Sequence, residues 1–183
     1  RVVFSIFKAM ISHLPLARTT SQSLLAEGAA VPSVWCVACD AWSCLSAAAM
    51  MVRPQVFALE QAWPAGELQD AQDPQALHVV LLSRVAEPVA CARLAPVAFG
   101  CWMISHVAVA SAHRGQGAGA VLMQVLLDRA QGMGLKSVSL HAQGHAVGFY
   151  TGLGFRTVGE PSPVRGVLHQ PMVWSAQVEP MQG

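Results

Sequence analysis

A glycine-rich turn precedes an apolar helical pattern in HRGQGAGAVLM, residues 113–123. Gly115, Gly117 and Gly119 alternate along this stretch. The first turn of a helix leaves several backbone N–H groups without partners, and the helix dipole adds positive potential at the same place. Because glycine has no Cβ, the backbone can approach a phosphate closely and adopt a left-handed turn. The stretch therefore predicts a phosphate-binding helix N-terminus.

Two common phosphate loops do not fit this spacing. A P-loop ends in Gly-Lys-Ser or Gly-Lys-Thr, whereas Ala120 and Val121 follow the last glycine here. A dinucleotide-binding loop has its first glycine directly after a strand and an acidic residue about 20 positions further on. In this chain residues 110–114 separate the glycine from the strand, and the next expected strand ends in His141. Neither loop accounts for the stretch.

A third pattern, R/Q-x-x-G-x-G/A, is matched by Arg114, Gly117 and Gly119. This pattern is typical of the acyl-CoA loop of the GNAT acetyltransferase superfamily, and residues 107–109 (VAV) stand upstream of it like that family's central strand. Residues 146–155 (AVGFYTGLGF) resemble the family's later A-x-x-x-Y-x-x-x-G-F motif. Since both motifs occur in the family's order, the chain resembles a GNAT N-acetyltransferase.

Three further stretches resemble the ElaA-like branch of this superfamily. Residues 53–61 (RPQVFALEQ) are similar to its R-x-x-V-F-x-x-E-Q, residues 143–146 (QGHA) to its Q-A-H, and residues 166–172 (GVLHQPM) to its G-I-P-H-x-x-M. The resemblance implies an α/β domain of the GNAT (acyl-CoA N-acyltransferase) fold. In that fold a mixed, mostly antiparallel central sheet is flanked by helices, and its central strands are splayed apart.

The same resemblance implies an acyl-CoA site at the splay, with acetyl-CoA as co-substrate and no metal. Backbone amides of residues 115–120 would hold the CoA pyrophosphate, and residues 107–109 would pair with the pantetheine arm as an added strand would. The cofactor-binding residues expected are Val107, Ala108, Val109, Arg114, Gly115, Gln116, Gly117, Ala118, Gly119, Ala120, Gln143 and Tyr150.

Catalytic roles are implied as well. Tyr150, the only tyrosine of the chain, would protonate the CoA thiolate as it leaves, and a backbone N–H near Val107 would hold the oxyanion. An amine is mostly protonated at neutral pH, so a base is needed, and we expect Glu60 or His106. The full set of candidate bases is Glu60, His106, His141, His145 and His169.

The function expected is acetyl-CoA-dependent N-acetylation of a primary amine, small-molecule or peptide, by direct attack. The alternative is a CoA-binding regulatory or structural protein without turnover. A cationic acceptor would require an acidic cleft, and only Glu60, Glu67 and Asp70 are near enough in sequence to suggest one.

The elements that must position these residues begin with a strand and two helical segments. A short apolar run at residues 34–38 predicts the strand, and Asp40 is a suitable N-cap for a helix over residues 45–51. Proline is tolerated in the first turn of a helix but not inside it. Pro54 therefore predicts that a second helical segment begins near Arg53.

The rest of the chain alternates as a mixed α/β sheet requires. Strands are expected at residues 78–83, 89–94, 100–109, 137–141, 155–158 and 166–174. Strand 100–109 is mostly apolar, so we expect it to be buried on both faces. Helices are expected from the glycine loop to Gly132 and over residues 145–153, with Gly154 as the C-cap of the second.

The composition excludes several partners. Charged residues make up 11% of the chain against 54% hydrophobic ones, and the net charge is +1. No positive field attracts nucleic acid, and no segment is apolar over the about 20 residues that a membrane span needs. We therefore expect no nucleic-acid or membrane partner. The use of acetyl-CoA that the resemblance implies leads us to expect a cytoplasmic enzyme. The weakly charged surface favours a homodimer.

The ends and the cysteines of the chain carry no expected chemistry. Residues 1–33 are basic and poor in acids, and we expect an N-terminal extension outside the GNAT domain at 34–174, with a C-terminal tail at 175–183. The five cysteines are odd in number and scattered. They are expected to be reduced and buried as small hydrophobic residues.

Overall fold

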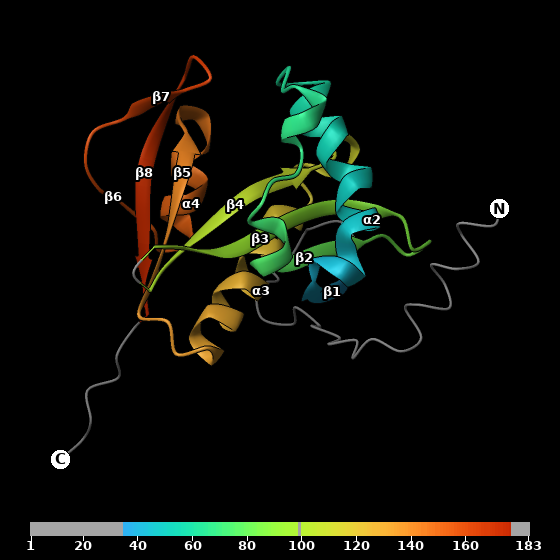
Figure 1. Ribbon diagram of the computed structural model, residues 1–183, viewed down its shortest axis with the longest axis horizontal. Coiled ribbons are helices and arrows are strands. Elements are labelled where there is room, and N and C mark those ends of the chain that lie inside the picture. Colours follow the sequence, from blue (N-terminus) through green and yellow to red (C-terminus); the bar gives the residue numbers. More distant parts are fainter. Residues whose placement is uncertain (1–34, 99, 177–183) are drawn as a thin grey trace, which may run out of the picture.

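One twisted sheet organises the part of the chain that the computed structural model describes, residues 35–98 and 100–176 (Figure 1). Its eight strands follow the order β1-β2-β3-β4-β5-β8-β6, and β7 pairs with β8. The strands are β1 (Cys36–Ala41), β2 (Leu77–Leu82), β3 (Pro88–Ala98), β4 (Cys101–Val109), β5 (Ser137–Gln143), β6 (Arg156–Thr157), β7 (Ser162–Val164) and β8 (Val167–Ser175). The predicted extension at residues 1–33 lies outside the described residues.

The sheet is splayed between β4 and β5. Every other pair of neighbouring strands is antiparallel, whereas β4 and β5 are parallel, and in the described residues Met103 opposite Ser139 is their one registered pair. The Ser139 hydroxyl donates to the carbonyl of Trp102 at 3.2 Å, beside that pair. Beyond it the two strands separate, and Figure 1 shows β5 and β8 turning away from β4. The mixed sheet with splayed central strands confirms the expected GNAT fold.

Helices cover both faces of the sheet because side chains alternate along its strands. On β2, Val79 and Leu81 pack in the core with α3 (Ala118–Gly132), while Val80 and Leu82 pack in the core with α2 (Trp42–Arg53). The third helix, α4 (Val147–Gly152), follows β5 and contributes Tyr150 to the α3 side. None of the helices in the described ranges has the length and apolar character needed to cross a bilayer.

A β-bulge interrupts β4 at His106. Cys91 pairs with Ala108 and Arg93 with Ser105, so two residues of β4, His106 and Val107, face the single residue between Cys91 and Arg93. His106 takes a left-handed backbone with φ of 52°. Such bulges bend a strand and re-aim its side chains, often beside a functional site.

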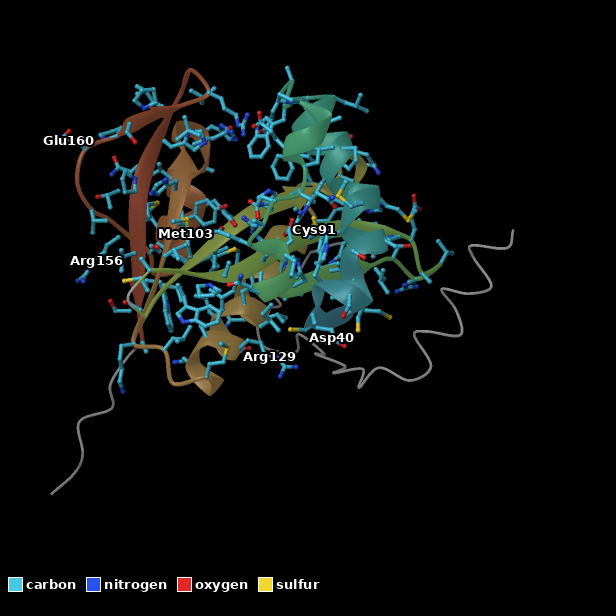
Figure 2. The ribbon with its side chains drawn as sticks, viewed as in Figure 1. Asp40, Cys91, Met103, Arg129, Arg156 and Glu160 are labelled. Atoms are coloured by element: carbon cyan, nitrogen blue, oxygen red, sulfur yellow. The ribbon has the colours of Figure 1, made fainter. Side chains whose placement is uncertain are left out.

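Strand β4 is not buried on both faces as the sequence predicts. Among its residues Ile104 and Ala108 are buried, and most others are partly exposed. An apolar sequence shows the composition of a strand but does not show how far away the neighbouring strand lies. Here the splay between β4 and β5 leaves one side of β4 open. Met103, labelled in Figure 2, lies where β4 still pairs with β5.

Two helix starts differ from the prediction. The N-cap of α2 is Ala41, while Asp40 belongs to β1 and accepts a hydrogen bond from the Ala41 amide at 2.7 Å. By contrast, the second helical segment predicted near Arg53 is present: the π-helical turn η1 (Pro54–Ala58) begins at the proline and continues directly from α2. The predicted helix at 145–153 is a 3-10 turn, η5 (Gly144–Ala146), followed by α4.

The cysteines are free, as expected, but most are not buried. Cys36 and Cys101 are exposed, Cys39 and Cys44 are partly exposed, and only Cys91 is buried. Cys91 lies beneath α2 (Figure 2), where burial raises the pKa of its thiol to about 12. The prediction of buried cysteines therefore holds for Cys91 alone among the five. Cys36 and Cys39 lie on the edge strand β1, Cys101 begins β4, and Cys44 lies on α2.

Candidate functional site

The glycine loop forms the N-terminus of α3. Gly117 is the N-cap of this helix with φ of 85°, and Gly115 has φ of 71°. The first backbone bond of α3 runs from the Val121 amide to the Gly117 carbonyl at 3.1 Å, so the amides of residues 118–120 have no partner within the helix. A Cβ on Gly119 would lie 3.3 Å from Cζ of Phe149, so glycine also keeps α3 close to α4. The loop has the geometry of an anion site.

A cavity of about 850 Å³ opens in front of this loop and is called the loop cavity here. It lies between the loop, the end of β4, the chain after η1, and η5 with the start of α4. Nine of the predicted cofactor-binding residues line it: Val107, Val109, Arg114, Gly115, Gly117, Ala118, Gly119, Ala120 and Gln143.

The other three predicted residues lie elsewhere. Ala108 alternates away from the cavity and is buried against α2. The side chain of Gln116 donates to the Ala112 carbonyl at 2.9 Å. Tyr150 lines a second cavity, described below. Val56 and Phe149 line the loop cavity without having been predicted, although each stands inside a motif that the sequence analysis quotes.

Arg114 is held at the mouth of the loop cavity by Glu60. Both carboxylate oxygens of Glu60 accept hydrogen bonds from Nη2 of Arg114, at 2.8 and 2.6 Å, and Nε of Arg114 donates to the Val109 carbonyl at 2.9 Å. Both side chains remain partly exposed. The carboxylate expected as a base is therefore bound to the loop that is expected to bind CoA.

A second, inner cavity of about 290 Å³ continues along the splay. It is lined by β4, β5 and η1, together with Trp63, Tyr150 and His169. Val107 and Gln143 line both cavities, so the two adjoin at the bulge of β4. At this junction Nε2 of Gln143 donates to Oε1 of Gln61 at 3.2 Å, a bond across 82 positions of the chain.

Tyr150 lies in the inner cavity, 8% exposed. Its ring packs edge-on against Phe149 and Phe155, with centroids 5.0 and 5.8 Å away. Burial raises the pKa of the phenol to about 12, so the hydroxyl stays protonated at neutral pH. Within the described residues this hydroxyl makes no hydrogen bond. It can therefore donate to a ligand in the cavity.

His106 lines the same cavity from the bulge. Burial, reinforced by the positive charges of Arg53 and Arg93, lowers the pKa of His106 to about 3. Its Nδ1 lies 3.4 Å from the Ser105 hydroxyl, and its buried Nε2 has no hydrogen-bond partner in the described part of the chain. His106 is thus a neutral imidazole with an open nitrogen.

The bulge is anchored by a buried ion-pair network. Asp73 accepts hydrogen bonds from Arg53 at 2.9 Å and from Arg93 at 2.8 Å, and all three side chains are almost fully buried. Arg93 also donates through Nε to the hydroxyl of Ser105 at 2.8 Å, one residue before His106. Arg53 therefore pairs with Asp73. The charge network fixes β3 and β4 beside the inner cavity.

The three acids that could have formed an acidic cleft are each paired with an arginine in the described residues. Glu60 is paired with Arg114, Glu67 with Arg165, and Asp70 with Arg93. No aspartate or glutamate of the described ranges lines the inner cavity. No group of three or more metal-ligating side chains occurs among these residues either.

A splayed sheet with a glycine-rich helix start at the splay defines the class of acyl-CoA-dependent acyltransferases. Residues 47–176 match the family described as acetyltransferase (GNAT) domain, so the chain belongs to the GNAT acetyltransferases. Enzymes of this family use acyl-CoA and act on amine acceptors. The predicted enzyme class is confirmed.

Similar proteins agree with this assignment. YjcF of Bacillus subtilis, an uncharacterised N-acetyltransferase, is 32% identical over 112 residues, 61% of this chain and 79% of that protein. The crystal structure of Escherichia coli ElaA gives a TM-score of 0.68 at 27% identity and covers 76% of this chain and 98% of its own. An acyl-CoA N-acyltransferase of Pseudomonas aeruginosa gives 0.68 at 29% identity, with the same shares. The likeness to ElaA agrees with the ElaA-like motifs.

Proposed function

We propose that this chain is an acetyl-CoA-dependent N-acetyltransferase in which a primary amine attacks the acetyl carbonyl directly. The observation that carries the proposal is the junction of the loop cavity and the inner cavity at Val107. A thioester bound through its diphosphate at the glycine loop presents its acetyl group at this junction. The amine then approaches from the inner cavity.

The chain's backbone supplies most of the CoA contacts in this proposal. The open amides of residues 118–120 and the guanidinium of Arg114 bind the diphosphate. The side of β4 that the splay leaves unpaired, residues 107–109, binds the pantetheine arm as a neighbouring strand would. Gln143 orients the arm at the junction.

Transfer forms the N–C bond while the C–S bond breaks. A backbone N–H at the bulge, next to Val107, stabilises the oxyanion of the tetrahedral intermediate. Tyr150 donates its proton to the departing sulfur and is reprotonated by the proton that the amine loses. The raised pKa of Tyr150 keeps the phenol protonated before each turnover.

The two expected bases have different positions. Glu60 faces the loop cavity and binds Arg114, so we propose that it positions the loop. His106 faces the inner cavity, and its open Nε2 accepts a hydrogen bond from the attacking amine. Its low pKa means that it does not hold the proton that an ammonium form of the acceptor must lose before attack. His141, His145 and His169, which also line the inner cavity, are the candidates for passing that earlier proton to water.

The last two points are the cellular compartment and the oligomeric state. We propose a cytoplasmic enzyme, because acetyl-CoA is consumed there. The homodimer stays a prediction.

The test combines binding with turnover. Calorimetry with CoA and acetyl-CoA measures the first, and release of free thiol in the presence of primary amines measures the second. Tyr150→Phe is expected to lower kcat about a hundredfold or more with the Kd for CoA unchanged. Thr151→Ala is the control, since it removes a hydroxyl from the same helix outside both cavities.

Two outcomes would contradict the proposal. Failure of both CoA and acetyl-CoA to bind removes its basis. Binding without thiol release from any amine supports the CoA-binding regulatory protein in its place.

A further inference from the structure

The inner cavity has an aromatic wall. Phe57 and Trp63 stack with centroids 4.6 Å apart and an interplanar angle of 25°. His106 stands edge-on to both rings, at 5.7 and 5.8 Å. Because Phe57 and the guanidinium of Arg165 already lie over the Trp63 ring, edge-to-face contact is the geometry by which this wall can recognise another ring.

The wall is also without free negative charge. The described lining residues include no carboxylate. The two acids nearest to Trp63 in the chain are both paired, Glu60 with Arg114 and Glu67 with Arg165. The guanidinium of Arg165 itself lies 4.3 Å from the centre of the Trp63 ring. A polycation in the cavity would leave buried ammonium groups uncompensated, which is strongly unfavourable.

Several polar groups of the cavity are neutral hydrogen-bonding groups. These are Gln61, Gln143, the Tyr150 hydroxyl and the imidazole of His106. Nε2 of His106 is a buried atom without a partner in the described chain, and buried polar atoms are normally bonded. A neutral amine supplies the missing partner through its N–H.

The size of the cavity limits the ligand. Its volume, about 290 Å³, lies at the lower end of the range for pockets that hold drug-sized molecules. A single ring with a short amine arm fits this space, whereas an oligosaccharide amine does not.

Resting on the function proposed above, we infer that the acceptor is a small primary amine that carries one aromatic ring and enters the inner cavity as the neutral amine. Its ring lies against Phe57 and Trp63, and its nitrogen donates to Nε2 of His106. In this position the nitrogen faces the junction at Val107, where the N–C bond forms and the C–S bond breaks.

Matched amines test the inference. Thiol release is measured with acetyl-CoA and 2-phenylethylamine, 2-cyclohexylethylamine, spermidine or a lysine peptide. The phenyl compound is expected to exceed its cyclohexyl counterpart about tenfold in kcat/KM, because only the ring differs. It is expected to exceed spermidine about a hundredfold, because spermidine brings unpaired charge into the cavity.

Two substitutions separate recognition from folding. Trp63→Leu is expected to abolish the preference for phenyl over cyclohexyl, whereas Trp63→Phe retains it. Trp102→Leu on β4, outside both cavities, is the matched control and leaves the preference unchanged. The Kd for CoA, measured by calorimetry, is expected to be the same in all of them.

The outcomes distinguish this inference from the function on which it rests. Equal or better turnover of the cyclohexyl amine, spermidine or the lysine peptide overturns the inference while the transferase stands. Binding of CoA with no turnover of the aromatic amine overturns it as well. Loss of CoA binding in the unmodified chain overturns both.

Discussion

Both carboxylate oxygens of Glu60 accept hydrogen bonds from the same guanidinium nitrogen of Arg114, at 2.8 and 2.6 Å, although the two residues are 54 positions apart in the chain. The pair joins the segment after η1, which leads to the inner cavity, to the loop that starts α3. A ligand diphosphate at that loop would meet an arginine already oriented by Glu60 and by the Val109 carbonyl. The structure therefore pairs Glu60 with the loop that is proposed to bind CoA.

Replacing Arg114 by Gln is expected to weaken CoA binding. The substitution removes a charged donor from the proposed diphosphate site, and hydrogen bonds to charged groups justify a rise in Kd of about ten- to a hundredfold. The difference in Kd between the variant and the unmodified chain should become smaller as the salt concentration rises, because part of the effect is electrostatic. Calorimetric titration at two salt concentrations measures both effects; an unchanged Kd would place the diphosphate elsewhere.

Glu60→Gln distinguishes a positioning residue from a base. Because the Glu60–Arg114 pair is exposed, its loss should change the free energy of unfolding by less than about 1 kcal/mol. We expect a changed Kd for CoA and a fall in kcat of less than about tenfold, whereas loss of a general base lowers kcat a hundredfold or more. Glu87→Gln, at the turn before β3, is the control. A large fall in kcat with unchanged CoA binding would restore Glu60 as the base.

Gly117→Ala should disturb the start of α3. At φ of 85° an alanine is strained, and we expect a loss of about 1 kcal/mol in the free energy of unfolding together with weaker CoA binding. Gly132→Ala is the matched control, because Gly132 ends the same helix without a positive φ and a Cβ there meets open space. Alanine at 132 is expected to stabilise the helix by up to about 1 kcal/mol. Urea denaturation of both variants provides the comparison.

The glycine loop could be predicted from sequence because its function is a local property. Glycines at 115, 117 and 119 and the helical pattern after them specify backbone conformation within a few residues, and Gly117 is the left-handed N-cap of α3. The order of strands and helices follows from equally local periodicity.

Contacts between distant residues could not be predicted in this way. Nothing near Asp73 in the chain shows that it meets Arg53 and Arg93, since burial of a charge depends on the partners that the fold brings to it. The same holds for Glu60 and Arg114. The bulge at His106 could not be predicted either, because the apolar pattern of a strand does not reveal that it holds one residue more than its partner strand.

The buried aspartate should make the fold sensitive to acid. Burial alone would raise the pKa of Asp73, but the hydrogen bonds and charge of Arg53, with the Asp70 amide and Arg93, hold the pKa well below its usual range. A group with a depressed folded pKa stabilises fully above its unfolded value of about 4 and loses that stabilisation as the pH falls toward its folded pKa. The free energy of unfolding should therefore decline as the pH is lowered below about 5.

Asp73→Asn should remove much of that acid sensitivity at a large cost in stability. The substitution leaves Arg53 and Arg93, 0% and 2% exposed, without their shared countercharge, and breaking a buried pair costs about 3–5 kcal/mol. Urea denaturation at pH 7 and at pH 4 is expected to show a lower free energy of unfolding that differs less between the two pH values. Asp128→Asn, an exposed acid on α3, should leave the profile unchanged. If Asp73→Asn lost less than about 1 kcal/mol at pH 7, the network would not be the anchor of the β4 bulge.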